Sequence, residues 1–142
     1  MIVKNIIYSI LGLLFMISCG GPALPEDVKS AYEELPKEID FNQHIKPILS
    51  DKCFICHGPD KTKVEAGLQL HLPKQAYAEL KESPGKYAIK PGNLSKSEIV
   101  NRILTTDQNL VMPEPSSHLS LTPYEKALLI KWIADGAEYK DH

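Results

Sequence analysis

The chain has 142 residues, with 16 Lys and Arg against 18 Asp and Glu, and its formal net charge is −2. This length has room for one domain with a modest hydrophobic core. The small net charge and the lack of a long Lys/Arg cluster exclude a surface that tracks phosphates, so we expect no nucleic-acid partner.

The N-terminus has the pattern of an export signal. The apolar stretch 6–17 is shorter than the roughly 20 residues of a membrane span. Cys19 follows between a serine and a glycine, an arrangement that resembles a lipobox, where cleavage leaves a lipidated cysteine as the new N-terminus. Met16 stands where lipoboxes usually carry Leu, so an uncleaved N-terminal anchor is the alternative. We predict a lipoprotein signal peptide at residues 1–18 and a domain on the periplasmic side of a bacterial envelope membrane.

Residues 19–40 are predicted to be a tether between the lipid and the folded domain. Three prolines and six acidic side chains lie between positions 20 and 40 and favour an extended chain. A short helix from Pro25 to Leu35 is the alternative within this segment. The folded domain is then expected to occupy residues 41–142.

Cys53 and Cys56 lie three positions apart and His57 follows directly, which is a C-x-x-C-H pattern. Two thiols on one helical turn can each form a thioether with a vinyl group of haem, and the adjoining imidazole can bind the iron from its proximal side. A thioredoxin-like redox pair usually lies in a βαβ pattern, and a zinc site needs two more ligands. The sequence offers neither, so the motif predicts one covalent haem c.

Apolar residues recur at helical spacing from Phe41 to Leu49 and predict a helix that ends at the haem motif. Pro47 either starts the regular part of this helix or bends it, because proline lacks the amide proton. The motif is followed by a polar loop. A second, short helix is expected over Lys74–Lys81.

Ser95 and Glu98 have the spacing of a capping box, so we expect a helix to begin there. Arg102 lies beside the apolar face of that helix. Its guanidinium could pair with a haem propionate through two parallel hydrogen bonds. A solvated arginine on the flank of a helix is the alternative.

Residues 107–120 are predicted to form an irregular loop that contains Met112. Pro113 and Pro115 exclude a regular helix and give a stiff backbone, which suits a distal iron ligand. A lone methionine in a loop is otherwise often a filler of the core. We predict that Met112 is the sixth iron ligand. Its rivals are three histidines: His44, His71 and His118.

Thr122 and Glu125 form a second capping box, with Pro123 in the first helical position. The helix that follows carries an apolar stripe, which needs a partner face. We expect this last helix to cross the helix before the haem motif and to pack against it, closing the fold around the haem.

These motifs together resemble the planctomycete-type cytochrome c domain, within the class I cytochrome c fold. The likeness covers roughly residues 39–142. Besides the motifs above, it includes Pro91-Gly92 and the run from Trp132 to Ala137. The resemblance implies an all-α fold whose helices and loops wrap around one covalent haem.

Residue by residue, the resemblance implies that Cys53 and Cys56 carry the haem thioethers, with His57 as proximal ligand and Met112 as distal ligand. The family often shows Met-Pro-Pro at the distal position, whereas Glu114 replaces the second proline here.

The expected function is single-electron transfer between periplasmic redox proteins by a protein that is not itself an enzyme. Ligation of iron by His and Met raises its potential, and no substrate need bind. Two alternatives stay open. The domain could be the electron-transfer module of a larger enzyme, since many relatives continue into much longer chains, or a haem sensor or peroxidase if the distal site is open.

Overall fold

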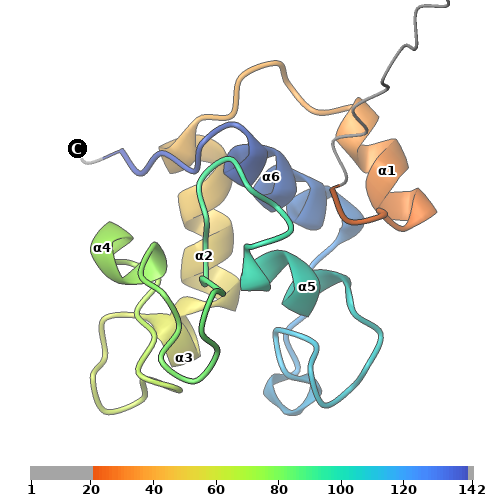
Figure 1. Ribbon diagram of the computed structural model, residues 1–142. Coiled ribbons are helices and arrows are strands. Elements are labelled where there is room, and N and C mark those ends of the chain that lie inside the picture. Colours follow the sequence, from red (N-terminus) through yellow and green to blue (C-terminus); the bar gives the residue numbers. More distant parts are fainter. Residues whose placement is uncertain (1–20, 141–142) are drawn as a thin grey trace, which may run out of the picture.

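The computed structural model describes residues 21–140, which form short helices joined by loops (Figure 1). The predicted signal peptide and Cys19 lie outside this range. In chain order the elements are α1 (Glu26–Glu33), the π-helical turn η1 (Phe41–Ile45), α2 (Lys46–Lys52), α3 (Phe54–His57), α4 (Pro73–Ala76), α5 (Glu98–Leu104), the 3₁₀ turn η2 (Pro115–Ser117) and α6 (Pro123–Ala134). Extended pairing in residues 21–140 is limited to isolated bridges of Tyr87 with Glu79 and Ser97. The all-α fold predicted from the sequence is confirmed.

The helix before the haem motif has two parts. The carboxylate of Asp40 accepts a hydrogen bond of 2.9 Å from the Gln43 amide and starts η1. Pro47 then lies in the first turn of α2, where a missing amide proton costs no hydrogen bond. Pro47 therefore starts the regular part of the helix, which was the first of the two effects predicted for it.

The last helix, α6, is the centre of the hydrophobic core. Its capping box is confirmed, since the Glu125 amide donates to the Thr122 hydroxyl over 3.2 Å and the Thr122 amide donates to the Glu125 carboxylate over 2.7 Å. The helix crosses η1, and the rings of Phe41 and Trp132 lie 5.8 Å apart between their centroids. The predicted packing of the last helix on the segment before the haem motif is thus confirmed.

The segment predicted as an extended tether differs in the structure. Residues 26–33 form α1, which packs along α6 and buries Val28 (Figure 1). Glu26 and Asp27 lie in its first turn, where negative charge is favourable for a helix. Burial of an apolar side chain against α6 outweighs the tendency of the acidic residues to extend the chain. The short helix that the sequence allowed between Pro25 and Leu35 is therefore present, and it packs against the domain predicted for residues 41–142.

The predicted capping box at Ser95 and Glu98 is wrong. The helix α5 begins only at Glu98, after Ser97. The side-chain oxygen of Asn93 accepts hydrogen bonds from the Ser95 hydroxyl over 2.9 Å and from the Lys96 amide over 3.0 Å. These bonds hold residues 93–96 in a turn, which competes with the helix and delays its start.

The predicted helix at Lys74–Lys81 is shorter than expected. It is the single turn α4, which ends at Ala76. The chain beyond it bends back on itself, because the Leu80 amide donates to the Lys86 carbonyl over 2.9 Å. This bond commits residues 80–86 to a loop.

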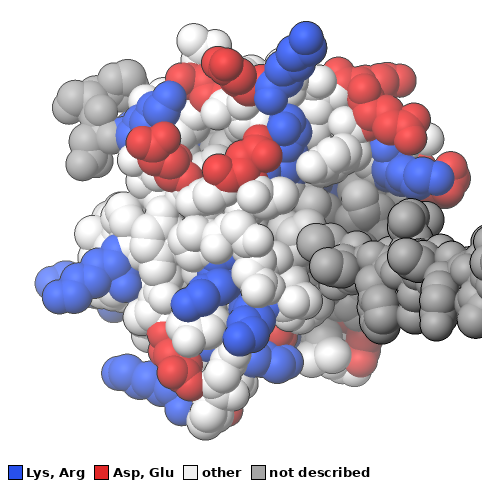
Figure 2. All heavy atoms as spheres, turned by 45° about the horizontal axis from the view of Figure 1, so that its top comes forward, with Lys and Arg blue, Asp and Glu red and all other residues white. Residues whose placement is uncertain are grey.

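The structure gives two observations that concern contacts with a membrane or with nucleic acid. Within residues 21–140, no helix is both long and apolar enough to cross a membrane. On the face shown in Figure 2, acidic and basic side chains are interspersed. The absence of a nucleic-acid partner stays a prediction.

Candidate functional site

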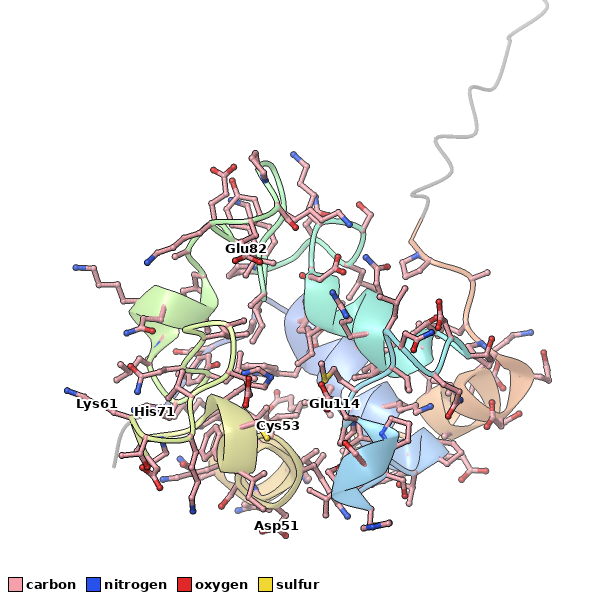
Figure 3. All side chains as sticks on the ribbon, turned by 90° about the horizontal axis from the view of Figure 1, so that it is seen from below. Asp51, Cys53, Lys61, His71, Glu82 and Glu114 are labelled. Atoms are coloured by element: carbon pink, nitrogen blue, oxygen red, sulfur yellow. The ribbon has the colours of Figure 1, made fainter. Side chains whose placement is uncertain are left out.

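A cavity of about 630 Å³ lies between the haem motif, α5 and the loop before α6. Ligand pockets in proteins commonly measure about 300–1,000 Å³. Most of its wall is apolar, formed by Ile55, Ala66, Leu68, Leu70, Leu80, Ala88, Ile99, Ile103, Pro113, Leu119 and Leu121. Figure 3 shows Cys53 and Glu114, which belong to different walls of this cavity, near the middle of the molecule.

All predicted haem-site residues within the described range line this one cavity. They are Cys53, Cys56, His57, Arg102 and Met112. The two cysteines and the histidine come from the end of α2 and from α3, whereas the arginine and the methionine come from segments about 50 positions further along the chain. The fold thus brings to one cavity the residues that the sequence predicted from separate motifs.

The haem motif forms a tight helical turn. The Cys53 carbonyl accepts hydrogen bonds from the amides of Cys56 and His57, at 3.2 Å and 2.8 Å. Both thiols are free. Burial, with a smaller contribution from the Glu125 carboxylate, raises the pKa of the Cys53 thiol to about 12. A redox-active cysteine pair needs a lowered thiol pKa, so this environment does not suit the thioredoxin-like alternative.

One nitrogen of the His57 imidazole lacks a hydrogen-bond partner. Its Nδ1 atom is buried and makes no hydrogen bond. Burial lowers the pKa of His57, although backbone groups of Leu68 and Glu65 and the Glu65 carboxylate oppose that shift. The neutral ring that results is the form that binds metal ions. A buried polar atom without a partner is unusual in proteins, and it fits a site that a bound group would complete.

The loop that follows the motif is fastened back onto it. The Glu65 amide donates to the Cys56 carbonyl over 2.9 Å, and the Leu70 amide donates to the His57 carbonyl over 2.8 Å. Gly58 lets the chain turn away from α3 at very close range. A Cβ atom at this position would come within 2.6 Å of the Phe54 Cβ and still closer to the Phe54 carbonyl oxygen. Glycine is therefore required here for steric reasons.

Met112 is held at the cavity by α5. Its amide donates to the Arg102 carbonyl over 2.9 Å. The three rival histidines do not line the cavity: the His44 Nδ1 accepts from the Asp40 amide over 2.9 Å, and the His71 ring packs edge-on against Phe54. Iron ligation by Met112 stays a prediction, and among the side chains considered for it Met112 is the one that lines the cavity.

Arg102 has protein partners that sequence reasoning missed. Its Nε donates to the Glu98 carboxylate over 3.2 Å and its Nη1 donates to the Leu110 carbonyl over 3.3 Å. The pairing with Glu98 follows the i, i+4 spacing, which is a signal in the sequence, whereas the contact with Leu110 depends on the fold. The contact with a haem propionate stays a prediction.

Sequence reasoning also missed that Glu65 and Glu114 line the cavity. Nothing in the spacing of either residue marks it as a site residue, since each lies in an irregular loop.

The residues present fit a covalently bound haem. The cavity has an adequate volume, a largely apolar wall, two neighbouring thiols, an imidazole and a thioether. Apolar walls that exclude water, together with nitrogen and sulfur ligands, are the means by which proteins bind haem and tune its potential.

Comparison with known proteins agrees with this site. Residues 53–116 match the model of a family described as Planctomycete cytochrome C. The matched segment starts at the first cysteine of the haem motif and extends past Met112, so it includes α5 and most of the cavity wall. No curated protein and no solved structure matches the chain.

Proposed function

We propose that this chain, whose residues 53–116 match the model of the planctomycete cytochrome C family, is a monohaem c-type cytochrome that carries single electrons between redox proteins. One observation supports this most strongly: the two thiols, the imidazole of His57 and the thioether of Met112 line the same apolar cavity. Haem in such a site supplies one-electron chemistry through the iron.

The protein side chains hold and shield the cofactor in this proposal. Cys53 and Cys56 would hold the haem through thioethers, and His57 and Met112 would bind its iron. A cavity wall that is mainly aliphatic keeps water from the iron, and a neutral methionine ligand favours the reduced state. The proposed role is that of a carrier and not of an enzyme, because iron held by His and Met can exchange electrons without binding a substrate.

We also propose that the protein is a lipoprotein, with its domain on the periplasmic side of the membrane. The support comes from the sequence around Cys19 and from the haem motif, since haem c is attached after export. Cys19→Ser should release the protein from the membrane fraction in soluble form while leaving the haem in place. Retention in the membrane would indicate an uncleaved anchor.

The covalent attachment can be tested by extraction. Thioethers survive acid and organic solvent, so the denatured wild-type protein should keep its haem. Cys53→Ala combined with Cys56→Ala should abolish this retention, whereas Cys19→Ser should not affect it. Haem that washes out of the wild-type protein would contradict the proposal.

The distal ligand can be tested by substitution. Met112→Ala should remove the weak absorption band that a sulfur ligand gives at the red edge of the visible spectrum. The vacated iron should then bind carbon monoxide readily, and its potential should fall. His118→Ala is the matched control, because this histidine lies in the same loop but does not line the cavity. If the wild-type protein lacks the band and Met112→Ala leaves the potential and the binding of carbon monoxide unchanged, a histidine is the ligand.

A further inference from the structure

Arg102 joins α5 to the loop that carries Met112 through two separate groups. Its guanidinium donates to the Leu110 carbonyl over 3.3 Å, and its backbone carbonyl accepts from the Met112 amide over 2.9 Å. A single residue therefore holds the backbone of the loop at two points, one on each side of Val111.

The loop has few other attachments. Residues 104–120 contain no buried side chain. The amides of Leu110 and Val111 both donate to the Asp107 carbonyl, a bond within the loop itself. In the part of the chain that the structure describes, the hydrogen bonds that join residues 110–112 to a helix all end at Arg102. The position of Met112 thus depends strongly on this residue.

Arg102 is itself fixed by Glu98, one turn earlier on α5. Glu98 accepts from the Arg102 Nε over 3.2 Å, and its second carboxylate oxygen accepts from Lys86 and Asn101, each over 3.2 Å. The side chains of Glu98 and Arg102 are 18% and 35% exposed, so the pair is partly shielded from water. A hydrogen bond between charged groups is stronger than a neutral one, and shielding from water strengthens it further.

The same pair forms part of the wall between two cavities. Glu98 and Arg102 line the large cavity, and both also line a second cavity of about 250 Å³, whose wall includes Thr105 and Leu110. A separated pair would therefore leave the loop at Leu110 without its side-chain contact to α5.

We propose that Arg102 is a positioning residue for the sixth iron ligand: through its two bonds to the loop and its pair with Glu98, it holds Met112 at the iron. This inference rests on the proposed function, because it requires that Met112 binds the iron. It assigns to the arginine the control of how readily the sulfur ligand is released. The haem propionate is not needed for this role.

The test compares holoproteins that carry Arg102→Gln or Arg102→Lys. Loss of one charge-assisted hydrogen bond to the loop should speed the binding of carbon monoxide to the ferrous protein about tenfold. The sulfur–iron band of the ferric protein should weaken, and the Met112 amide should exchange its proton faster. The lysine variant should not restore the wild-type values, because an ammonium group is a point charge and lacks the planar fork that reaches Glu98 and Leu110 together.

Lys131→Gln is the matched control. Lys131 forms an i, i+4 ion pair with Asp135 over 2.8 Å, at the end of α6 and away from both cavities. Its substitution also removes one cation from a helix surface, and it should leave the band, the carbon monoxide rate and the Met112 amide unchanged.

Three outcomes would overturn this inference. If the arginine variants shift the potential but leave the band, the ligand rate and the amide exchange as in the wild type, Arg102 acts on a propionate and the inference is overturned. A wild-type protein that lacks the sulfur–iron band overturns the proposed ligation, and the inference with it. If the band is present and Lys131→Gln has the same effect as the arginine variants, the effect is a general loss of charge.

Discussion

The half of the domain built on α6 and the half that surrounds the cavity are held together by different means. The buried side chains of α6 are Ala127, Leu128, Leu129, Ile130, Trp132 and Ile133, and they pack on α1 and η1. The loops at 59–69 and 104–120, which border the cavity, contain no buried side chain. The α6 half therefore has a hydrophobic core made of its own side chains, whereas the other half has apolar side chains that line a cavity.

This difference shows what a bound haem would contribute to the fold. Burial of apolar surface is the main favourable term in folding, at about 25 cal/mol per Å². The α6 half gains this term from its own side chains. The partly exposed apolar residues of the cavity wall, such as Leu68 and Leu119, gain it fully only when an apolar group fills the cavity. Segments with few buried contacts open first, so the cavity loops should depend most on the haem.

Removal of the haem should have the largest effect, and it should fall on one half. In Cys53→Ser combined with Cys56→Ser, amides of residues 59–69 and 104–120 should lose most of their protection against hydrogen exchange. The amides of α6 should lose the least. Hydrogen exchange of the holoprotein and the variant, read by mass spectrometry, measures both. Equal loss of protection in both halves would mean that the α6 core does not stay folded without the haem.

A cavity in the α6 core should have the converse effect. Leu129 is fully buried, and Leu129→Ala should lower the free energy of unfolding by about 2–5 kcal/mol. Chemical unfolding followed by circular dichroism measures this loss. The absorption spectrum of the folded variant should match that of the wild type, because Leu129 does not line the cavity. A changed spectrum would show that the two halves are coupled through the core.

Gly58 lies where the haem motif meets the loop, and a substitution there should produce a smaller loss. Gly58→Ala places a methyl group against the backbone of Phe54, and overpacking of this kind costs about 1–3 kcal/mol. Gly21→Ala is the control, because a Cβ atom there would meet only Leu94, at an ordinary 3.8 Å. Unfolding by denaturant should separate the two variants. Equal stability of both would contradict the close contact at α3.

The smallest effect should come from acid and should involve Glu98. Burial raises the pKa of this carboxyl, but hydrogen bonds from Asn101 and Lys86, with the charges of Lys86 and Arg102, outweigh burial and hold the pKa below its ordinary value of 4.5. A carboxyl whose pKa is lowered by folding stabilises the folded state fully at pH values above its unfolded pKa. This stabilisation disappears as the pH falls through the lower pKa of the folded state.

The stability of the wild type and of Glu98→Gln should therefore converge on acidification. At neutral pH the wild type should be more stable, and below about pH 4 the difference should shrink. Denaturant unfolding of both proteins at several pH values measures the gap. A gap that does not change with pH would mean that the ionised carboxylate contributes nothing to stability.

The parts of the site that the sequence predicted well are those set by local spacing. The haem motif needs only one helical turn to bring Cys53, Cys56 and His57 together, and the capping box of Thr122 and Glu125 needs only three residues. Local geometry of this kind changes little with the rest of the fold, so the pattern carries most of the information.

The predictions that failed depend on competing or distant contacts. The turn made by the Asn93 side chain displaces the capping box expected at Ser95, although both use the same type of hydrogen bond. The helix α1, which the sequence allowed only as the alternative to an extended tether, forms because Val28 packs against α6, about 100 positions away. The bond from Arg102 to the Leu110 carbonyl likewise follows from the path of a loop, which no periodic pattern encodes.

The central claim is a haem whose iron is bound by His57 and Met112, and a redox titration followed by optical spectroscopy tests it most directly. The purified wild-type protein should show a c-type haem spectrum and one reversible one-electron transition. The oxidised protein should show the sulfur–iron band at the red edge of the visible spectrum, and the reduced protein should bind carbon monoxide slowly. A spectrum without that band, together with rapid binding of carbon monoxide, would contradict the account and favour a sensor or a peroxidase.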